Sequence, residues 1–430
     1  MYDNINKTDI HLCCSCGICE GICGKGAITM KKNEYGFFTP VLDQEKCNNC
    51  GLCYSVCPGD KIKDHEIYEN IGQNVPNDYL VGNIVECFNA KIKDKELRDR
   101  CTSGGMVTGL ISYLLEKHIY DVAFCVDTYD YSEQVKTVAI DAEIKLDNTV
   151  QSRYVTVSHK NLIRYMLENR DKKIIIVAVG CAMAGIRYTI TKFKLNLDNY
   201  LCLGLFCACQ YSYKTWDYFQ MYNAKKKIKS LEFRNKNGKK YAYGMIKVTY
   251  GDDKKILHTI HRAYIKSDFS MERCWYCTDL LNVYSDISFG DNNTKSKDGE
   301  SGTIIVRSEL GAKIIEIFEE ANMFYKENVP VDEIKDTKYR KKREYYYVSF
   351  LRGRENTLYP DRNFSEYEDD RRYDDEYKKQ MKKSAWALEK NNYKKLWIVN
   401  QLKYLKLRIF KKNYLAELPL NLNQIKEKND

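Results

Sequence analysis

Apolar residues fall at helical spacing directly after a pair of glycines in the first third of the chain. The stripe comprises Met106, Val107, Leu110, Ile111, Leu114 and Leu115, and Cys101-Thr-Ser-Gly-Gly105 precedes it. This spacing predicts an amphipathic helix. Thr102 or Ser103 can cap the helix, and Gly104 and Gly105 leave backbone N–H groups open to an anion at its positive end. An ordinary N-cap with flexible glycines explains the same residues, so the pattern alone leaves both interpretations open.

Short apolar runs further along predict the strands of a parallel sheet. Ile174–Val179 is largely β-branched, as is typical of strands buried on both faces, and Tyr120–Val126 and Leu201–Phe206 are further candidates. The stretch from Ala182 to about Phe193 can form a helix. Because strand, helix and strand then follow one another, we expect a crossover that joins parallel neighbours.

Composition and charge narrow the class of protein. The first ten residues are polar and lack the apolar stretch of a secretory signal, and the longest apolar run, Ile174–Ile186, is shorter than the roughly 18 residues of a membrane span. We therefore expect a cytoplasmic protein without a transmembrane helix. The 69 Lys and Arg residues against 59 Asp and Glu are spread along 430 residues without a nucleic-acid-binding signature, so no nucleic-acid partner is expected.

Two cysteine runs near the start of the chain share the C-x2-C-x2-C-x3-C spacing of bacterial ferredoxins. Three thiolates of each run hold one [4Fe-4S] cluster, while the fourth reaches across to the other. This assigns Cys13, Cys16, Cys19 and Cys57 to a first cluster, and Cys23, Cys47, Cys50 and Cys53 to a second. Zinc more often takes paired C-x2-C units and is the weaker alternative. Cys14 stands outside the spacing and is interpreted as a bystander thiol.

Four further cysteines suggest a third site. Cys181 and Cys207 each follow a predicted strand, so they should lie side by side at the carboxyl edge of the sheet, where ligands bind. Cys274 and Cys277 form another C-x2-C pair. The four together could hold a third [4Fe-4S] cluster, or they could be buried free thiols lining a cofactor pocket. The remaining cysteines are expected to be small core residues or pocket walls: Cys87, Cys101, Cys125, Cys202 and Cys209.

In their order along the chain, these features resemble the family of coenzyme F420 hydrogenase/dehydrogenase beta subunits. The matching landmarks are the double cysteine run, Ser103-Gly104-Gly105, Gln151-Ser-Arg-Tyr-Val155, Gly180-Cys181-Ala-Met-Ala-Gly185, Leu205-Phe-Cys207, Cys274-Trp-Tyr-Cys277 and Ser285-Asp-Ile-Ser-Phe-Gly-Asp291. The resemblance covers roughly the first 330 residues. The sequence departs from the family pattern at Gly24 and Gly180, where proline is usual, and at Ala208-Cys209, where His-Gly is usual.

The resemblance implies an FAD-containing oxidoreductase that passes electrons between the clusters and FAD and on to the deazaflavin coenzyme F420 or another small organic acceptor. A flavin is the common converter between one-electron carriers and a two-electron substrate. Matching positions suggest a flavin pocket of Ser103, Gly104, Gly105, Arg153, Tyr154, Cys181 and Gly185. No catalytic residue is assigned, and the missing histidine after Cys207 points to another substrate or a different proton route. The alternative is a non-enzymatic subunit or adaptor that delivers electrons to a partner protein.

The last part of the chain differs from the rest. Residues 378–412 contain twelve basic residues and only Glu389 as an acid, with Trp386, Trp397, Leu402, Leu405 and Ile409 interleaved. A solvated helical face is the favoured interpretation, and peripheral contact with a membrane or an anionic partner is the alternative.

The predicted fold class is α+β, with a bacterial-ferredoxin-like domain, an α/β flavin-binding domain and a helical basic tail. We expect these parts at 1–60, 79–335 and 336–430, with a linker at 61–78.

Overall fold

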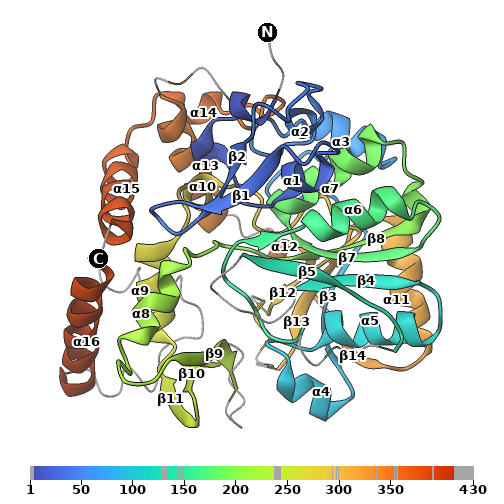
Figure 1. Ribbon diagram of the computed structural model, residues 1–430. Helices are drawn as coiled ribbons and strands as arrows, with labels where there is room; N and C mark the ends of the chain where they lie inside the picture. The colour runs from blue at the N-terminus through green and yellow to red at the C-terminus, as the bar shows by residue number, and fades with distance from the viewer. Residues whose placement is uncertain are drawn as a thin grey trace.

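The computed structural model describes residues 4–126, 134–143, 146, 149–236, 244–292, 294–296, 298, 300–334, 338–352, 354, 357–389 and 392–410. In Figure 1 a small N-terminal unit lies on top of a large sheet, and a column of C-terminal helices runs down one side. The molecule is therefore a mixed α/β protein with a ferredoxin-like N-terminal part and a helical C-terminal part.

The N-terminal unit has one antiparallel hairpin and several short helices. Its elements are η1 (Ile5–Lys7), η2 (Ile10–Leu12), α1 (Ile18–Ile22), β1 (Ile28–Lys32), β2 (Phe38–Leu42) and α2 (Leu52–Ser55). Left-handed backbone at Gly17 and Gly51 starts α1 and α2, with φ of 68° and 76°. This conformation favours glycine because a Cβ would crowd the backbone there.

A nine-stranded mixed sheet forms the centre of the molecule (Figure 1). Its strands are β3 (Glu86–Ile92), β4 (Val122–Val126), β5 (Val135–Ile140), β6 (Val157–Ser158), β7 (Ile174–Val179), β8 (Tyr200–Leu205), β12 (Ile287–Asp291), β13 (Gly302–Val306) and β14 (Phe324–Asn328). They lie in the order β14-β3-β13-β12-β8-β7-β4-β5-β6. The central strands β12, β8, β7 and β4 are parallel, as the strand–helix–strand pattern predicts.

Both faces of this sheet are covered. The helices of the central part are α4 (Lys95–Arg100), α5 (Met106–Glu116), α6 (Lys160–Glu168), α7 (Gly180–Lys192) and α11 (Glu309–Glu320). Ile175 and Val177 of β7 pack in one core with α5 and α11. Ile174 and Ile176 face the other way and share a core with α6, α7 and the N-terminal unit. A strand buried on both sides explains why β7 is apolar throughout.

A second, three-stranded antiparallel sheet stands beside the large one. It consists of β9 (Ile228–Asn235), β10 (Met245–Tyr250) and β11 (Asp253–Leu257) in the order β11-β10-β9. The helices beside it are α8 (Lys214–Gln220) and α9 (Ile260–Phe269), while η4 (Leu197–Asn199) precedes β8 of the large sheet and α10 (Glu272–Tyr276) follows α9. The sheet packs on α8 and α9 through a separate apolar core that includes Phe219 and Phe233.

The C-terminal helices wrap back over the rest of the chain. They are α12 (Val331–Ile334), α13 (Lys338–Leu351), α14 (Ser365–Glu368), α15 (Asp374–Leu388) and α16 (Asn392–Phe410). α15 and α16 follow one another down the left edge of Figure 1. Among the described helices, none has the length and apolar character needed to cross a bilayer.

The polar segment at 61–78 is folded and tied to the C-terminal part. It contains α3 (Asp64–Asn70), in which Asp64 and Tyr68 are fully buried. The Asp64 carboxylate pairs with Arg362 at 2.8 Å, and the Tyr68 hydroxyl donates to the Val283 carbonyl. Long-range pairing therefore orders a segment whose composition indicated a linker.

Candidate functional site

The two cysteine runs adopt the same local conformation. Ser15 and Asn49, each two residues after the first cysteine of a run, both have φ of 55°, and Gly17 and Gly51 follow in the left-handed region as well. The amide of Ser15 donates to Cys13 Sγ at 3.4 Å, and that of Asn49 donates to Cys47 Sγ at the same distance. Equal backbone turns thus aim equivalent thiols inward, as two cubane sites of one ferredoxin unit require.

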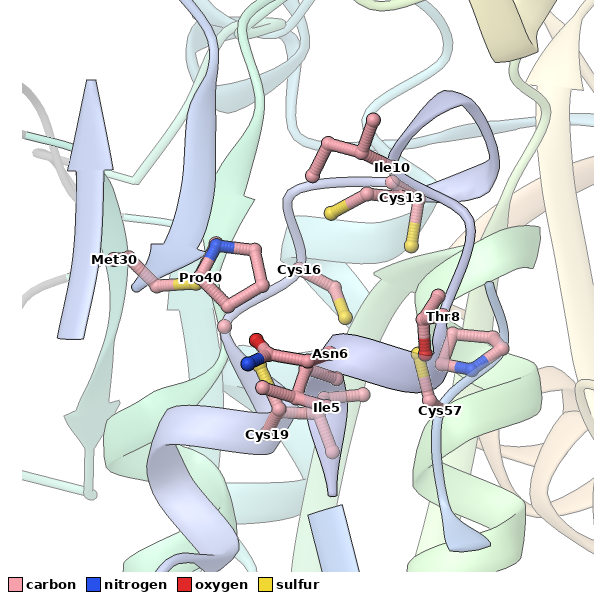
Figure 2. A pocket seen from close by; sticks show the side chains of 14 residues that line it. Ile5, Asn6, Thr8, Ile10, Cys13, Cys16, Cys19, Met30, Pro40 and Cys57 are labelled. Carbon is pink, nitrogen blue, oxygen red and sulfur yellow. The ribbon is translucent and has the colours of Figure 1, made fainter. Parts of the chain in front are cut away.

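Two cavities gather the eight cysteines of these runs into the sets that the spacing predicts. The larger cavity, of about 210 Å³, is lined by Cys13, Cys16, Cys19 and Cys57, together with Cys14. Figure 2 shows Cys13, Cys16, Cys19 and Cys57 around this space. The second cavity is lined by Cys23, Cys47, Cys50 and Cys53. In each cavity, three cysteines of one run therefore meet the fourth cysteine of the other.

Burial raises the pKa of thiols in the first cavity. Desolvation raises the pKa of Cys13 to about 12 and that of Cys19 well above its usual value. In the second cavity, burial raises the pKa of Cys53 to about 11. A bound metal centre offsets this effect because its positive charge stabilises thiolates. These residues fit iron–sulfur clusters by donor chemistry, because each set of four cysteines lines one cavity.

The cysteines of the predicted third site also converge. Cys181 lies in the first turn of α7, Cys207 follows β8, and Cys274 and Cys277 lie in and just after α10. Cys277 is close enough to raise the pKa of the other three thiols, although burial has the larger effect on Cys207 and Cys274. The amide of Gln210 donates to Cys274 Sγ at 3.3 Å. Four cysteines from three segments thus meet at the carboxyl edge of β7 and β8.

Within the described part of the chain, no three His, Cys, Asp or Glu side chains gather closely enough to hold a single metal ion. The cysteine sets above are accordingly defined by the cavities and the electrostatic contacts that they share.

Cys14, interpreted from its position as a bystander, links the first cavity to the third cysteine set. The thiols of Cys16 and Cys181 both lie beside its sulfur, and this contact holds the pKa of Cys14 well below its usual value. Cys209 likewise lies close to Cys207 and Cys274 and raises their pKa values. Spacing alone could not reveal either contact, because both depend on how distant segments pack.

Arg273 is a buried cation between the first cavity and the third cysteine set. Its guanidinium donates to the carbonyl of Leu12, directly before the first run, and at 2.8 Å to that of Pro58, directly after the second. Burial alone would lower the pKa of this guanidinium, but the nearby sulfurs of Cys14 and Cys181 raise it.

The Nε–H of Arg273 has no hydrogen-bond partner within the part of the chain that the structure describes. An unpartnered donor beside thiolates suits an N–H···S contact to a cluster. No sequence pattern indicates the role of Arg273, because the residues that it contacts are distant in the chain.

His159 lies at the contact between the N-terminal unit and the part of the chain that forms the large sheet. Its amide donates to the Cys16 carbonyl at 2.8 Å, and burial lowers the pKa of its imidazole to about 4. Nearby, a Cβ on Gly17 would lie 2.4 Å from Ser158 Oγ. The cluster-bearing unit is therefore packed tightly against α6.

The residues predicted to form a flavin pocket divide into two groups. Ser103, Gly104 and Gly105 lie at the start of α5, where a Cβ on Gly104 would lie 2.3 Å from the Ala90 carbonyl oxygen. Cys181 and Gly185 belong to α7 and face the N-terminal unit, since a Cβ on Gly185 would meet Ile18 and Pro58. Gly185 thus provides a close helix contact with the cluster unit.

Basic and aromatic side chains surround the start of α5. Lys236, just after β9, donates to the Ser103 carbonyl at 3.1 Å, and Arg234 pairs with Asp291 at 2.7 Å. Arg262 from α9 is buried near Arg234, Tyr154 and Tyr211, and burial lowers the pKa of both Arg262 and Lys236. Buried cations are costly unless an anion accompanies them.

Tyr154 stacks on Tyr211 in this same region, with ring centroids 5.3 Å apart, and meets Phe233 edge-on. Arg153, its neighbour in the predicted pocket, is half-buried. β9 therefore supplies Phe233 and Arg234, neither of which the sequence singled out, to a site that combines positive charge with aromatic surface.

A ferredoxin-like unit with two cavities lined by cysteines, set against an α/β sheet, defines an iron–sulfur electron-transfer protein. Residues 12–61 match the 4Fe-4S dicluster domain. Residues 87–164 and 171–332 match the N-terminal and C-terminal parts of the coenzyme F420 hydrogenase/dehydrogenase beta subunit. The chain belongs to the family of coenzyme F420 hydrogenase/dehydrogenase beta subunits.

Several relatives illustrate this membership. One of the subunits of the F(420)H(2) dehydrogenase of Methanosarcina mazei is 22% identical over 315 residues, which cover 71% of this chain and 82% of that protein. The coenzyme F420 hydrogenase subunit beta of Methanococcus voltae is 28% identical, covering 59% and 87%. A chain of the F420-reducing [NiFe] hydrogenase complex from Methanosarcina barkeri, a xenon-derivatised structure, aligns with a TM-score of 0.46 at 22% identity and covers 63% of this chain and 90% of that one.

Proposed function

We propose that this protein is an iron–sulfur flavoprotein oxidoreductase subunit that passes electrons between [4Fe-4S] clusters and FAD, and on to coenzyme F420 or another small organic acceptor. The observation that carries the proposal is a series of neighbouring sites: the second cavity, the first cavity, the third cysteine set beside Cys14, and the basic, aromatic region beside Cys209. Redox centres placed in series make a relay.

In this proposal the eight cysteines of the two runs ligate two clusters in the sets that line the two cavities. Cys181, Cys207, Cys274 and Cys277 ligate a third, whose place at the sheet edge is the ligand-binding edge of open α/β folds. The Gln210 amide N–H supports the Cys274 thiolate there, and the guanidinium Nε–H of Arg273, unpartnered among the described residues, is available to another sulfur. The competing interpretation, free thiols around a pocket, predicts no iron at this site.

The region around the start of α5 fits the FAD pyrophosphate. The N-cap Gly105 makes no side-chain capping bond, so the helix N-terminus has N–H groups available for an anion. Lys236 and Arg262 add positive charge that is desolvated, and Tyr154 and Tyr211 offer aromatic surface for a ring system. Bound flavin supplies the conversion between one-electron and two-electron transfer.

The acceptor is less constrained by the chain than the cofactors are. Ala208 and Cys209 stand where relatives usually have His-Gly, and the Ala208 carbonyl accepts from Arg343 at 2.9 Å. A basic group near this turn can therefore come from α13 in place of the missing imidazole. Because relatives are named as subunits of F420 hydrogenase and F420H2 dehydrogenase, we also propose a protein partner that exchanges electrons with the clusters.

Anaerobic purification with cofactor analysis tests the proposal. We expect cluster absorption together with flavin bands, FAD release on denaturation, and flavin reduction by at least one of deazaflavin or nicotinamide donors. Lys236→Gln should lower the FAD content, whereas Lys247→Gln, which removes the pair with Glu232 on the same small sheet, should not. Full iron without flavin would refute the flavoprotein and favour an adaptor that only delivers electrons to a partner.

A further inference from the structure

The last described helix, α16, exposes an unusual combination of side chains. Ile398, Val399, Leu402 and Leu405 are 53%, 43%, 61% and 51% exposed. The other exposed residues of the described part of this helix are Lys394, Lys395, Lys403 and Lys406. Where its side chains are described, the outward face of α16 therefore carries only aliphatic and lysine side chains.

The opposite face of α16 is held firmly against α8 and α9. Leu396 and Asn400 are buried, and the Asn400 amide donates to the Tyr218 hydroxyl at 3.2 Å. Trp397 packs edge-on against Tyr222, and Gln401 donates to the same tyrosine at 2.5 Å. These contacts fix the rotation of the helix. The aliphatic residues consequently face away from the protein in the folded state.

Helical geometry arranges the outward residues as a stripe with basic borders. At about 100° per residue, Ile398, Leu402 and Leu405 fall within an arc of about 60°. Lys395 and Lys406 border the arc on one side, together with Val399, and Lys394 borders it on the other. Lysine stems can lie along an apolar surface while their ammonium groups reach outward to phosphate.

We infer that the outward face of α16 binds an anionic lipid bilayer surface and holds the protein peripherally on the membrane. The aliphatic stripe enters the boundary between headgroups and acyl chains, and the bordering lysines meet lipid phosphates. Trp386, 42% exposed at the end of α15, lies shortly before α16 in the chain and is of the type enriched at membrane interfaces.

The composition favours lipid over a protein partner. Protein interfaces are depleted in lysine and enriched in aromatic residues and arginine, whereas the exposed face here has four lysines and no aromatic residue or arginine among its described side chains. Lysine beside aliphatic residues, with no acid on this face to neutralise it, is the pattern of interfacial helices. This inference does not depend on the proposed redox function.

Vesicle sedimentation with the full, cofactor-loaded chain tests it. We expect binding to vesicles of phosphatidylcholine with roughly one-third phosphatidylglycerol, weakened by salt, and little binding to pure phosphatidylcholine. Lys394→Gln/Lys395→Gln/Lys406→Gln should weaken binding on the order of a hundredfold, at about fivefold per lysine. Leu402→Ser/Leu405→Ser should weaken it about tenfold or more while leaving the charge unchanged.

Val41→Ser provides the matched control, because Val41 is an exposed aliphatic residue on β2 of the N-terminal unit and not on α16, so its loss should leave vesicle binding unchanged. Unchanged visible absorption of every variant shows that the fold and the cofactors are retained. Equal binding to neutral and anionic vesicles, no binding to either, or binding insensitive to both α16 variants would overturn the inference. So would light scattering that finds a dimer abolished by Leu402→Ser/Leu405→Ser, since the stripe would then serve self-association.

Discussion

Cys181, at the start of α7, lies beside Cys14, the residue between the first two cysteines of the ferredoxin-like run, and their contact lowers the pKa of Cys14. One sulfur–sulfur contact thus joins the first cavity to the third cysteine set. Arg273 reinforces the junction through the carbonyls of Leu12 and Pro58. Side chains from different parts of the chain therefore join the N-terminal unit to the third cysteine set.

Iron content distinguishes a third cluster from a set of free thiols. We expect about twelve irons per wild-type chain and about eight in Cys274→Ser, because loss of one ligand from a four-cysteine site removes that cluster alone. Cys125→Ala is the matched control, since Cys125 is buried in β4 within the apolar core and belongs to none of the three cysteine sets. Iron and sulfide assays on anaerobic protein measure the difference. Equal iron in wild type and Cys274→Ser would leave only two clusters.

Arg273→Gln should lower the reduction potentials of the clusters beside it. A cation favours the reduced, more negative state of a nearby centre, and loss of a unit charge at close range in a protein shifts a one-electron potential on the order of 100 mV. Redox titration followed by electron paramagnetic resonance measures this. Arg273→Lys keeps the charge with fewer hydrogen bonds, so it should restore most of the potential. Equal potentials in Arg273→Gln and wild type would show that Arg273 only ties the two loops together.

Local patterns predicted the elements well where a strand or helix is self-contained. β7 has the predicted bounds, β8 begins one residue earlier than the expected strand and ends one residue earlier, and α5 starts at Met106 as its apolar stripe indicates. The cysteine spacing also anticipated the sets that line the two cavities. In each case the signal lies within a short stretch, such as a β-branched run or a fixed cysteine spacing.

The other site residues and the contacts between elements could not be predicted, because they arise from packing between distant segments. Arg273, Lys236 and Arg262 carry no motif, and each gains its place only when α10, β9 and α9 come beside other elements. Gly185 resembled a pocket residue, but it lies against Ile18 and Pro58. Likewise, the rotation of α16 depends on its contacts with Tyr218 and Tyr222, which the basic pattern does not reveal.

The buried pair between Asp64 and Arg362 should be essential for stability. The Arg362 guanidinium donates to both carboxylate oxygens, at 2.8 Å and 3.0 Å, and both side chains are almost fully buried. Arg362→Met leaves a buried carboxylate without its partner, which should lower the free energy of unfolding by about 3–5 kcal/mol. Arg372→Met, which breaks a solvent-screened pair with Asp370, should lower the free energy of unfolding far less. Similar urea midpoints for the two variants would contradict this prediction.

The buried imidazole of His261, which packs against α16, makes the free energy of unfolding depend on pH. Its imidazole is buried, lies 3.3 Å from the Tyr222 hydroxyl and contacts the Tyr404 ring of α16 with centroids 4.9 Å apart. Burial, and then the charges of His258 and Lys255, lower its pKa to about 4. The unfolded chain therefore binds a proton between about pH 6.5 and pH 4 that the folded protein does not, so stability is complete above pH 6.5 and falls as the pH decreases through this window.

His261→Phe should remove this acid sensitivity. Between pH 7.5 and pH 5.5 the wild type should lose roughly 1 kcal/mol of unfolding free energy through His261, and the variant should lose correspondingly less, because phenylalanine fills a similar volume without titrating. Urea unfolding at the two pH values measures the difference, with His118→Asn as the control at an exposed histidine. If the variant loses as much stability on acidification as the wild type does, the proton is taken up elsewhere. A smaller loss in the variant than in the wild type would assign that part of the acid sensitivity to His261, the buried imidazole beside Tyr404 of α16.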